Sequence, residues 1–203
     1  MSDFWNERYS NTAYIYGETP NRYFEKELLK LSPGKILLPA EGEGRNAVFA
    51  ARIGWQVFAF DYSHQAMKKA QQLADKQSVN IHYQVADFAE VSYEKQSFDA
   101  VAVIFAHFAM EEKKGFLKKM TSLLKPGGAF IMEVFSKNQL KYQQINPTSG
   151  GPRDLEMLYD TEELKPWISG FQTLELKETE VELQEGTHHA GRASVVRFSG
   201  IKK

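Results

Sequence analysis

The sequence predicts an α/β fold in which a doubly wound sheet carries helices on both faces. Short apolar runs rich in β-branched and aromatic residues alternate with segments whose apolar residues repeat at helical spacing. The central runs are apolar almost without interruption, which is typical of parallel strands covered on both faces. Beyond residue 170, polar and apolar residues alternate instead, which indicates an antiparallel hairpin that closes the sheet.

The individual elements follow from the same patterns. Strands are expected over residues 35–38, 56–60, 81–85, 100–105 and 129–135. Ser63 is a suitable N-cap for the helix after the second strand, and a later helix ends just before Pro126. In the hairpin the apolar residues change from even to odd positions between Leu176 and Val181. This change predicts a bulge or slip near residues 177–180.

We expect residues 1–203 to form a single domain of four consecutive segments. An aromatic-rich segment with a first helix (1–31) precedes a core (32–136) that contains the five strands. A turn-rich flap loop (137–160) and a last helix with the hairpin (161–203) follow.

Composition excludes several classes of function. A net charge of −1 offers neither a basic patch for nucleic acid nor a polybasic membrane signal. No apolar run approaches the roughly 20 residues of a membrane-spanning helix, and the N-terminus lacks the pattern of a signal peptide. With no cysteine, the chain cannot form a disulfide or a thiolate metal site. We therefore expect a cytoplasmic protein that binds no nucleic acid, membrane or metal.

The first candidate site lies where the first strand ends, because ligands of α/β sheets bind outside the carboxyl ends of the strands. The strand leads into Glu41-Gly42-Glu43-Gly44, and a helix follows. The two glycines let the backbone approach a ligand closely, and the helix N-terminus can face an anion. The same segment could equally be no more than a tight turn.

Acidic residues also follow the second and third strands. Asp61 lies 19 residues after Gly42, close to the ~20-residue offset at which a carboxylate binds a ribose diol. Asp87 and Phe88 follow the third strand, where they suit the amino group and the ring of adenine. Either aspartate could instead cap a helix or a turn. The glycine loop and both aspartates follow strands that are expected to end at the same edge of the sheet. Their occurrence together at this edge predicts a nucleoside-containing cofactor.

In order and spacing these features resemble the class I S-adenosylmethionine-dependent methyltransferases. The resemblance covers residues 35–133 and rests on the glycine loop, the two aspartates, the FDAV strand and the LKPGG turn. Within that superfamily the chain is most similar to the tellurite-resistance and thiopurine methyltransferase-like group. The shared details are GRN after the glycine loop, a Tyr-rich N-terminal segment and a His/Arg-bearing hairpin turn. The resemblance implies a Rossmann-like, seven-stranded mixed sheet, with S-adenosylmethionine as cofactor and S-adenosylhomocysteine as product.

The resemblance also implies which residues border the cofactor. They are Tyr16, Glu41, Gly42, Gly44, Asn46, Asp61, Tyr62, Asp87, Phe88 and Phe105. By similarity, Asp61 would bind the ribose and Asp87 with Phe88 the adenine. The chain departs from the family pattern at Leu38, where an acidic residue is usual, and Glu41 could supply the missing carboxylate.

The expected reaction is in-line methyl transfer to a small molecule, such as a thiol or a chalcogen oxyanion like tellurite or selenite. A hard oxygen or nitrogen acceptor would need a general base, and His107 after the fourth strand is the best-placed candidate. His188, His189 and Arg192 in the hairpin turn are candidates for acceptor binding. A structural histidine and an exposed polar turn are the alternative interpretations. A monomer or a homodimer is expected.

Two other functions stay open. Gly42, Gly44 and Ala47 satisfy G-x-G-x-x-G/A, and Asp61 suits NAD equally well, so an NAD-dependent oxidoreductase fits the core. Against it, Glu41 and Glu43 would crowd a pyrophosphate with negative charge, and no second half is evident to hold a nicotinamide. The altered first strand would also fit a catalytically inactive cofactor-binding protein.

Overall fold

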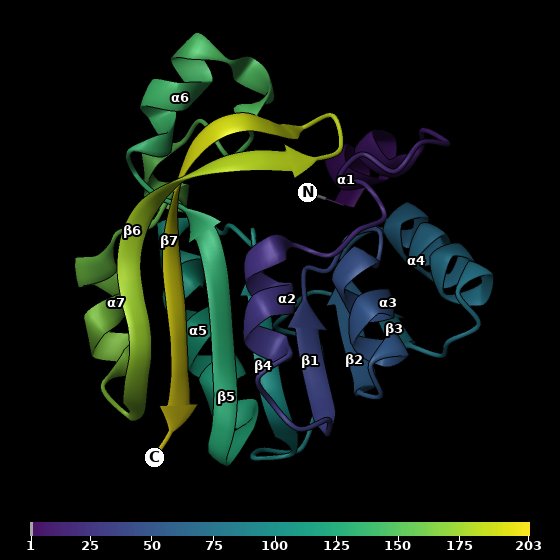
Figure 1. Ribbon diagram of the computed structural model, residues 1–203, viewed down its shortest axis with the longest axis vertical. Coiled ribbons are helices and arrows are strands. Elements are labelled where there is room, and N and C mark those ends of the chain that lie inside the picture. The colour runs from purple at the N-terminus through teal and green to yellow at the C-terminus, as the bar shows by residue number, and fades with distance from the viewer. Residues whose placement is uncertain (1) are drawn as a thin grey trace.

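A computed structural model describes residues 2–203 and shows one seven-stranded mixed sheet (Figure 1). The strands are β1 (Lys35–Pro39), β2 (Gln56–Asp61), β3 (His82–Val85), β4 (Phe98–Ile104), β5 (Leu124–Phe135), β6 (Phe171–Glu185) and β7 (His189–Lys202). Their order is β3-β2-β1-β4-β5-β7-β6, with β1 to β5 parallel and β7 antiparallel to both of its neighbours. The predicted fold class is confirmed.

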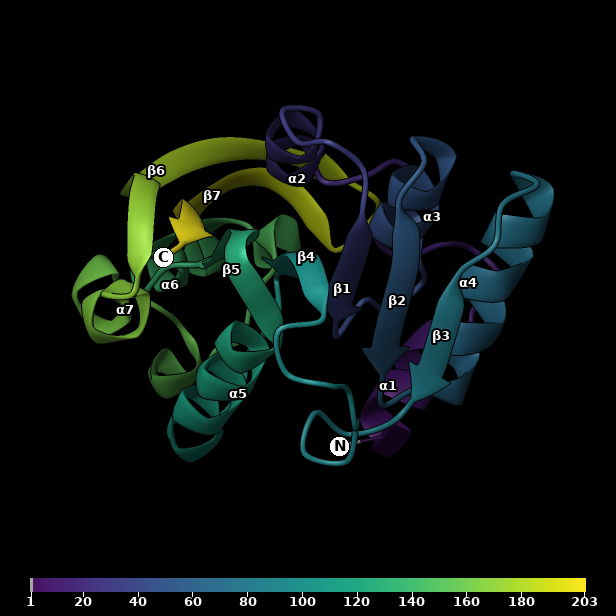
Figure 2. The same cartoon turned by 90° about the horizontal axis from the view of Figure 1, so that it is seen from below.

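Helices cover both faces of this sheet (Figure 2). On one face lie α2 (Arg22–Leu28), α3 (Arg45–Arg52) and α4 (His64–Lys76); on the other lie α5 (Met110–Leu123) and α7 (Thr161–Ile168). Two more helices, α1 (Ser2–Tyr9) and α6 (Gln139–Ile145), lie beyond the carboxyl edge of the parallel strands (Figure 1). Across residues 2–203, none of the helices is long and apolar enough to cross a membrane.

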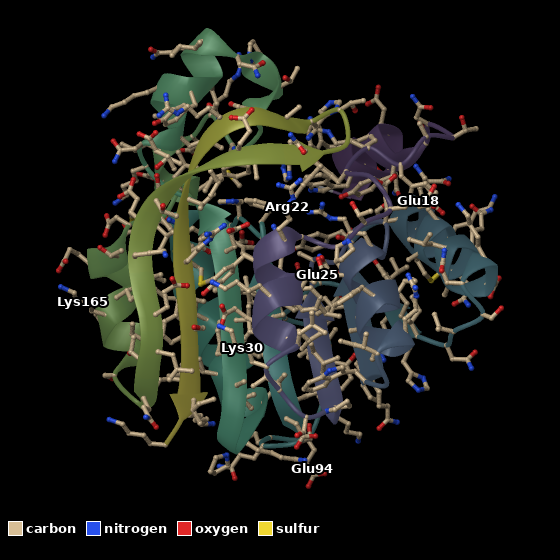
Figure 3. All side chains as sticks on the ribbon, in the orientation of Figure 1. Glu18, Arg22, Glu25, Lys30, Glu94 and Lys165 are labelled. Atoms are coloured by element: carbon tan, nitrogen blue, oxygen red, sulfur yellow. The ribbon has the colours of Figure 1, made fainter. Side chains whose placement is uncertain are left out.

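The uninterrupted apolar pattern of the central strands has a direct structural reason. In β1, Leu37 packs into the core beneath α5, whereas Ile36 and Leu38 pack beneath α2 and α3. Since successive side chains of a strand point to opposite faces, both faces of the strand need apolar residues here. Lys30, two residues after α2, is exposed, and Glu25 of α2 is half-buried (Figure 3).

Several local predictions can be compared directly with the structure. The side chain of Ser63 accepts a hydrogen bond from the N–H of Ala66 at 3.1 Å, so the predicted N-cap of α4 is confirmed. Each predicted strand is present, with ends that differ by a few residues. The helix α1 was not predicted, because its aromatic residues do not follow one helical stripe.

The predicted position of the hairpin irregularity was wrong. The register between β6 and β7 shifts between Thr173 and Glu175, not near residues 177–180. The extra residue is Leu174, whose side chain is 61% exposed, whereas Phe171 and Leu176 both pack beside α7. The change from even to odd apolar positions has another cause: Leu176 packs in the cluster of Val196 and Phe198, whereas Val181 and Leu183 pack in a separate cluster with Ala193 and Val195.

The segment 137–160, predicted as a flap loop, contains regular structure. It holds α6 and two 3-10 turns, η1 (Pro147–Ser149) and η2 (Leu155–Met157). The buried amide of Gln139 donates to Ser149 and to the carbonyl of Gly150 at 2.9 Å, and accepts from the N–H of Ser194 in β7 at 2.8 Å. These hydrogen bonds fasten the segment to the hairpin near the carboxyl edge of the sheet.

Candidate functional site

The residues predicted to carry chemistry converge at one edge of the sheet. Strands β1 to β5 all point toward the edge where α1 and the tip of the β6–β7 hairpin lie (Figure 1). This edge is where α/β sheets bind ligands, because the strand order reverses there between β1 and β4. The loops after β1, β2, β3 and β4 supply the groups described below.

The glycine loop after β1 has an unusual backbone. Ala40, Gly42 and Gly44 have φ angles of 51°, 63° and 87°, all in the left-handed region. A Cβ on Gly44 would lie 2.5 Å from the Cβ of Ala70, so this glycine allows α3 to pack closely on α4. A Cβ on Gly42 would lie 2.8 Å from the hydroxyl of Tyr9, a residue of α1. The backbone of the loop therefore has a conformation that favours glycine, and Tyr9 of α1 covers the loop at Gly42.

Glu41 turns its carboxylate into the start of α3. Its oxygen Oε1 accepts from the N–H groups of Asn46 at 2.9 Å and Ala47 at 2.8 Å. Burial raises the pKa of Glu41 to about 7, although these hydrogen bonds lower it. The free N–H groups that would bind an anionic ligand at this helix N-terminus are thus already used. The side chain of Glu41 serves as a cap here, which disfavours its expected role as a carboxylate beside the cofactor.

This burial makes the stability depend on pH in a defined direction. Between its ordinary pKa and about 7, Glu41 holds a proton in the folded chain but not in the unfolded chain, so stability falls as pH rises through this window. We expect Glu41→Gln to keep the acceptor oxygen and to flatten the fall in melting temperature between about pH 5 and pH 8. Glu94→Gln, at an exposed site, should leave the slope unchanged. Equal slopes in wild type and Glu41→Gln would contradict this account.

Asp61, at the end of β2, is buried beside the glycine loop. Its carboxylate accepts from the N–H of Gly42 at 3.1 Å and from the N–H of Ser63 at 3.0 Å. Burial raises the pKa of Asp61 to about 6, and these hydrogen bonds oppose the rise. Each carboxylate oxygen has two lone pairs, so both oxygens can accept a further hydrogen bond.

An apolar cavity lies next to Asp61. It has a free volume of about 10 Å³, room for about one water molecule, and is lined by Ala40, Phe60, Asp61, Tyr62, Ala86, Phe88 and Phe108. The ring of Phe88 is held edge-on against Phe108 at 5.3 Å between centroids. Asp87 borders this region but uses one oxygen to accept from the N–H of Ala89 at 2.6 Å. The structure therefore brings Asp61, Tyr62 and Phe88 together around one cavity.

The N-terminal segment covers the glycine loop. The carboxylate of Glu43 accepts from the N–H groups of Ile15 at 2.8 Å and Tyr16 at 3.3 Å, and it pairs with Lys69 of α4. On the other side, the carbonyl of Ile15 accepts from the N–H of Thr187 in the hairpin turn at 2.8 Å. Tyr16 is thus held between the loop and the hairpin, near the place predicted for it.

A buried polar network joins segments that are far apart in the sequence. The amide of Asn21, before α2, donates to Glu133 of β5 at 2.7 Å and to Glu185 of β6 at 2.9 Å. Arg45 of α3 donates to Glu185 at 2.7 Å and to the carbonyl of Tyr16 at 3.1 Å. The coulombic effect of Arg45 and the hydrogen bond from His189 outweigh burial and lower the pKa of Glu185 to about 2.

Sequence reasoning did not find this network. Glu185 and Arg45 are separated by 140 residues, and no local pattern links a hairpin residue to a helix start. The signal in the sequence was Glu185 itself. It is a carboxylate at a buried position of the hairpin, directly across the hairpin turn from His189. Arg22, which follows Asn21, adds a second contact to the hairpin. Its guanidinium donates to Gln184 at 2.9 Å beneath the hairpin (Figure 3).

The predicted base His107 has no free ring nitrogen. Its Nε2 accepts from the N–H of Phe135 at 3.2 Å, so Nδ1 carries the proton and donates to the carbonyl of Met157 at 3.0 Å. Burial lowers the pKa of His107 to about 3. The geometry favours a structural role, in which the ring joins the end of β5 to η2, and it disfavours the prediction of a catalytic base.

The structure separates the three candidates of the hairpin turn. His189 is buried between the rings of Tyr16 and Phe105, each 4.5 Å away between centroids. His188 is exposed next to it. Arg192 points away from both, with a side chain 70% exposed and an ion pair to Glu180 at 2.6 Å. Of the three residues predicted to bind the acceptor, His189 is the one whose side chain is buried at this edge of the sheet.

Comparison with known proteins agrees with this geometry. Residues 36–128, which hold β1 to β4 and the glycine loop, match the model of the family described as "Methyltransferase domain". The probable S-adenosyl-L-methionine-dependent methyltransferase TehB of Haemophilus influenzae is 22% identical over 192 residues, which are 94% of this chain and 62% of TehB. Residues 36–128 thus form a methyltransferase domain, and the chain is similar to the class I S-adenosylmethionine-dependent methyltransferases. The cofactor of this family, S-adenosylmethionine, is the predicted one.

Other relatives show how widely the family varies. The structure of TehB from Haemophilus influenzae superimposes with a TM-score of 0.73 at 18% identity, over 100% of this chain and 67% of that one. A structure described as converting a disulfide bond into a thioacetal group in echinomycin biosynthesis gives a TM-score of 0.78 at 16% identity, over 100% and 92%. A ubiquinone biosynthesis O-methyltransferase of Coxiella burnetii is 22% identical, over 86% and 79%. The two solved structures share the fold of this chain, while the names of these proteins indicate different reactions.

A metal site does not emerge from the structure. Within residues 2–203, no group of three or more His, Asp or Glu side chains is arranged to hold an ion.

Proposed function

We propose that the chain is an S-adenosylmethionine-dependent methyltransferase that acts on a small molecule and holds its cofactor at the carboxyl edge of β1 to β4. The observation that carries the proposal is the buried carboxylate of Asp61. It is fixed by the N–H of Gly42 at the mouth of an apolar cavity. A carboxylate next to apolar and aromatic side chains is the combination that a ribose joined to an adenine requires.

The residues of this edge fit the cofactor in chemistry as well as in shape. Both oxygens of Asp61 keep a lone pair for the two ribose hydroxyls. The small cavity between Tyr62 and Phe88 would widen by movement of these side chains to take the adenine ring, and Asp87 beside it would accept from the amino group. Tyr16 and the backbone of Gly42 and Gly44 would border the methionine part.

The bound cofactor supplies a methyl group on a sulfonium, which is already a good leaving group. The protein therefore has to align the acceptor and to exclude water rather than activate the methyl donor. The N-terminal segment, the hairpin turn and the segment 137–160 surround the expected methyl position near Phe105. A site enclosed on these sides favours a compact acceptor, and the resemblance to the tellurite-resistance and thiopurine methyltransferase-like group makes thiols and chalcogen oxyanions candidates for it.

The cap on α3 distinguishes this proposal from the NAD-dependent alternative. A dinucleotide places its pyrophosphate at the N-terminus of the helix after the glycine loop. Here the carboxylate of Glu41 occupies the N–H groups of Asn46 and Ala47. A pyrophosphate would have to displace a buried carboxylate and then stand beside Glu43.

Calorimetric titration with S-adenosylhomocysteine and, in parallel, with NAD tests the proposal. We expect micromolar binding of S-adenosylhomocysteine and no binding of NAD. The reverse result would identify the glycine loop as that of a dehydrogenase and overturn the proposal. Binding without turnover on any member of a panel of thiols, selenite and tellurite would favour a catalytically inactive cofactor-binding protein.

A further inference from the structure

Two histidines lie at the edge of the sheet where methyl transfer is expected, and their ring nitrogens differ. Both nitrogens of His107 are bonded to backbone groups. His189 has one partner: its Nδ1 lies 3.4 Å from Oε2 of Glu185. Across residues 2–203, no hydrogen bond reaches its Nε2. Of the two rings, His189 alone keeps a nitrogen lone pair available.

The partner of His189 fixes its tautomer. A carboxylate only accepts hydrogen bonds, so Nδ1 has to carry the proton and Nε2 has to be the unprotonated nitrogen. Glu185 is itself held as a carboxylate by Arg45 at 2.7 Å and by the amide of Asn21 at 2.9 Å. Burial lowers the pKa of His189 to about 4, although the hydrogen bond to Glu185 raises it, so the ring is neutral at pH 7.

The ring of His189 packs against segments that border the edge of the sheet where the acceptor is expected. The ring lies against Tyr16 of the N-terminal segment and against Phe105, the residue that follows β4. On the Cδ2 side, next to Nε2, a Cβ on Gly150 would approach within 2.5 Å, so the segment 137–160 closes this side through a glycine. The ring of His189 thus lies between three segments at the edge of the sheet.

We infer that His189 is the general base of the methyl transfer, that Glu185 is its positioning residue, and that the acceptor is a hydroxyl or neutral thiol rather than an oxyanion. This inference rests on the proposed function. The acceptor oxygen or sulfur forms a bond to the methyl carbon, and the carbon–sulfur bond of the cofactor breaks with its electron pair on sulfur. The acceptor's proton passes to Nε2 of His189. An oxyanion acceptor carries no proton to remove and would make this arrangement unnecessary.

The first test reads the tautomer and needs no acceptor. In the full chain labelled with ¹⁵N, we expect NMR at pH 7 to show His189 with a proton on Nδ1 and none on Nε2. In Glu185→Gln the preference for this tautomer should decrease. A proton on Nε2 of the wild-type ring, or a doubly protonated ring, would overturn the inference. This readout is independent of whether S-adenosylhomocysteine binds, so a failure of the proposed function is seen separately, by calorimetry.

The second test compares acceptors with and without a proton. The probes are catechol and 2-mercaptoethanol on one side and selenite on the other, with formation of S-adenosylhomocysteine as the signal. We expect His189→Gln to lower kcat for catechol or 2-mercaptoethanol by about 100-fold or more while KM and cofactor affinity change little. His64→Gln, exposed at the start of α4, is the matched control and should keep full activity. Turnover of selenite alone, or unchanged kcat in His189→Gln, would overturn the inference.

Discussion

Replacing Asp61 with alanine is expected to weaken the binding of S-adenosylhomocysteine by roughly 100- to 10,000-fold. Hydrogen bonds to a charged group contribute about 1.5–3 kcal/mol, and the ribose would lose two of them at once. The substitution also removes the acceptors for the N–H groups of Gly42 and Ser63, which loosens the glycine loop. Calorimetric titration of the purified variant gives the affinity directly.

The matched control is Asp75→Ala, because Asp75 lies on the exposed side of α4 and its recorded contact is to Gln71. Its affinity for S-adenosylhomocysteine should equal that of the wild type. The two variants change the net charge by the same amount, so a general electrostatic effect would appear in both. Equal affinities in Asp61→Ala and wild type would remove the ribose assignment from Asp61.

The parts of the site that could be predicted are those that local sequence determines. The glycine loop and Asp61 follow their strands directly, and a parallel sheet brings the ends of its strands to one edge. Knowing the strand alternation was therefore enough to place these residues together. The cap by Ser63 was predicted for the same reason, since it depends on a single turn of chain.

The parts that could not be predicted depend on contacts across the fold. The position of His189 beside Phe105 depends on how the hairpin curves. The irregularity of the hairpin was itself predicted a few residues away from the bulge at Leu174. Glu41 was expected to face the cofactor, yet its carboxylate caps α3, because burial without those N–H partners would leave a charge unsatisfied. Composition and spacing contain no signal that chooses between these orientations.

The largest loss of stability is expected for Gly44→Ala. The added Cβ would lie 2.5 Å from the Cβ and 2.8 Å from the Cα of Ala70, a contact that neither helix can relieve by rotating a side chain. The φ angle of 87° adds backbone strain for any residue with a Cβ. Together these effects should lower the free energy of unfolding by about 2–4 kcal/mol, measured by urea denaturation.

Gly115→Ala provides the matched control for this prediction. Gly115 lies inside α5, where an added Cβ has nothing within 4 Å and the backbone is helical. Alanine in a helix interior is favoured over glycine by about 0.5–1 kcal/mol, so this variant should be as stable as the wild type or more so. A lower free energy of unfolding in Gly44→Ala, together with an equal or higher one in Gly115→Ala, would show that the contact between α3 and α4 requires Gly44. Equal urea midpoints in the two variants would show that the loop accommodates a Cβ, and the close packing of α3 on α4 would then not explain the glycine.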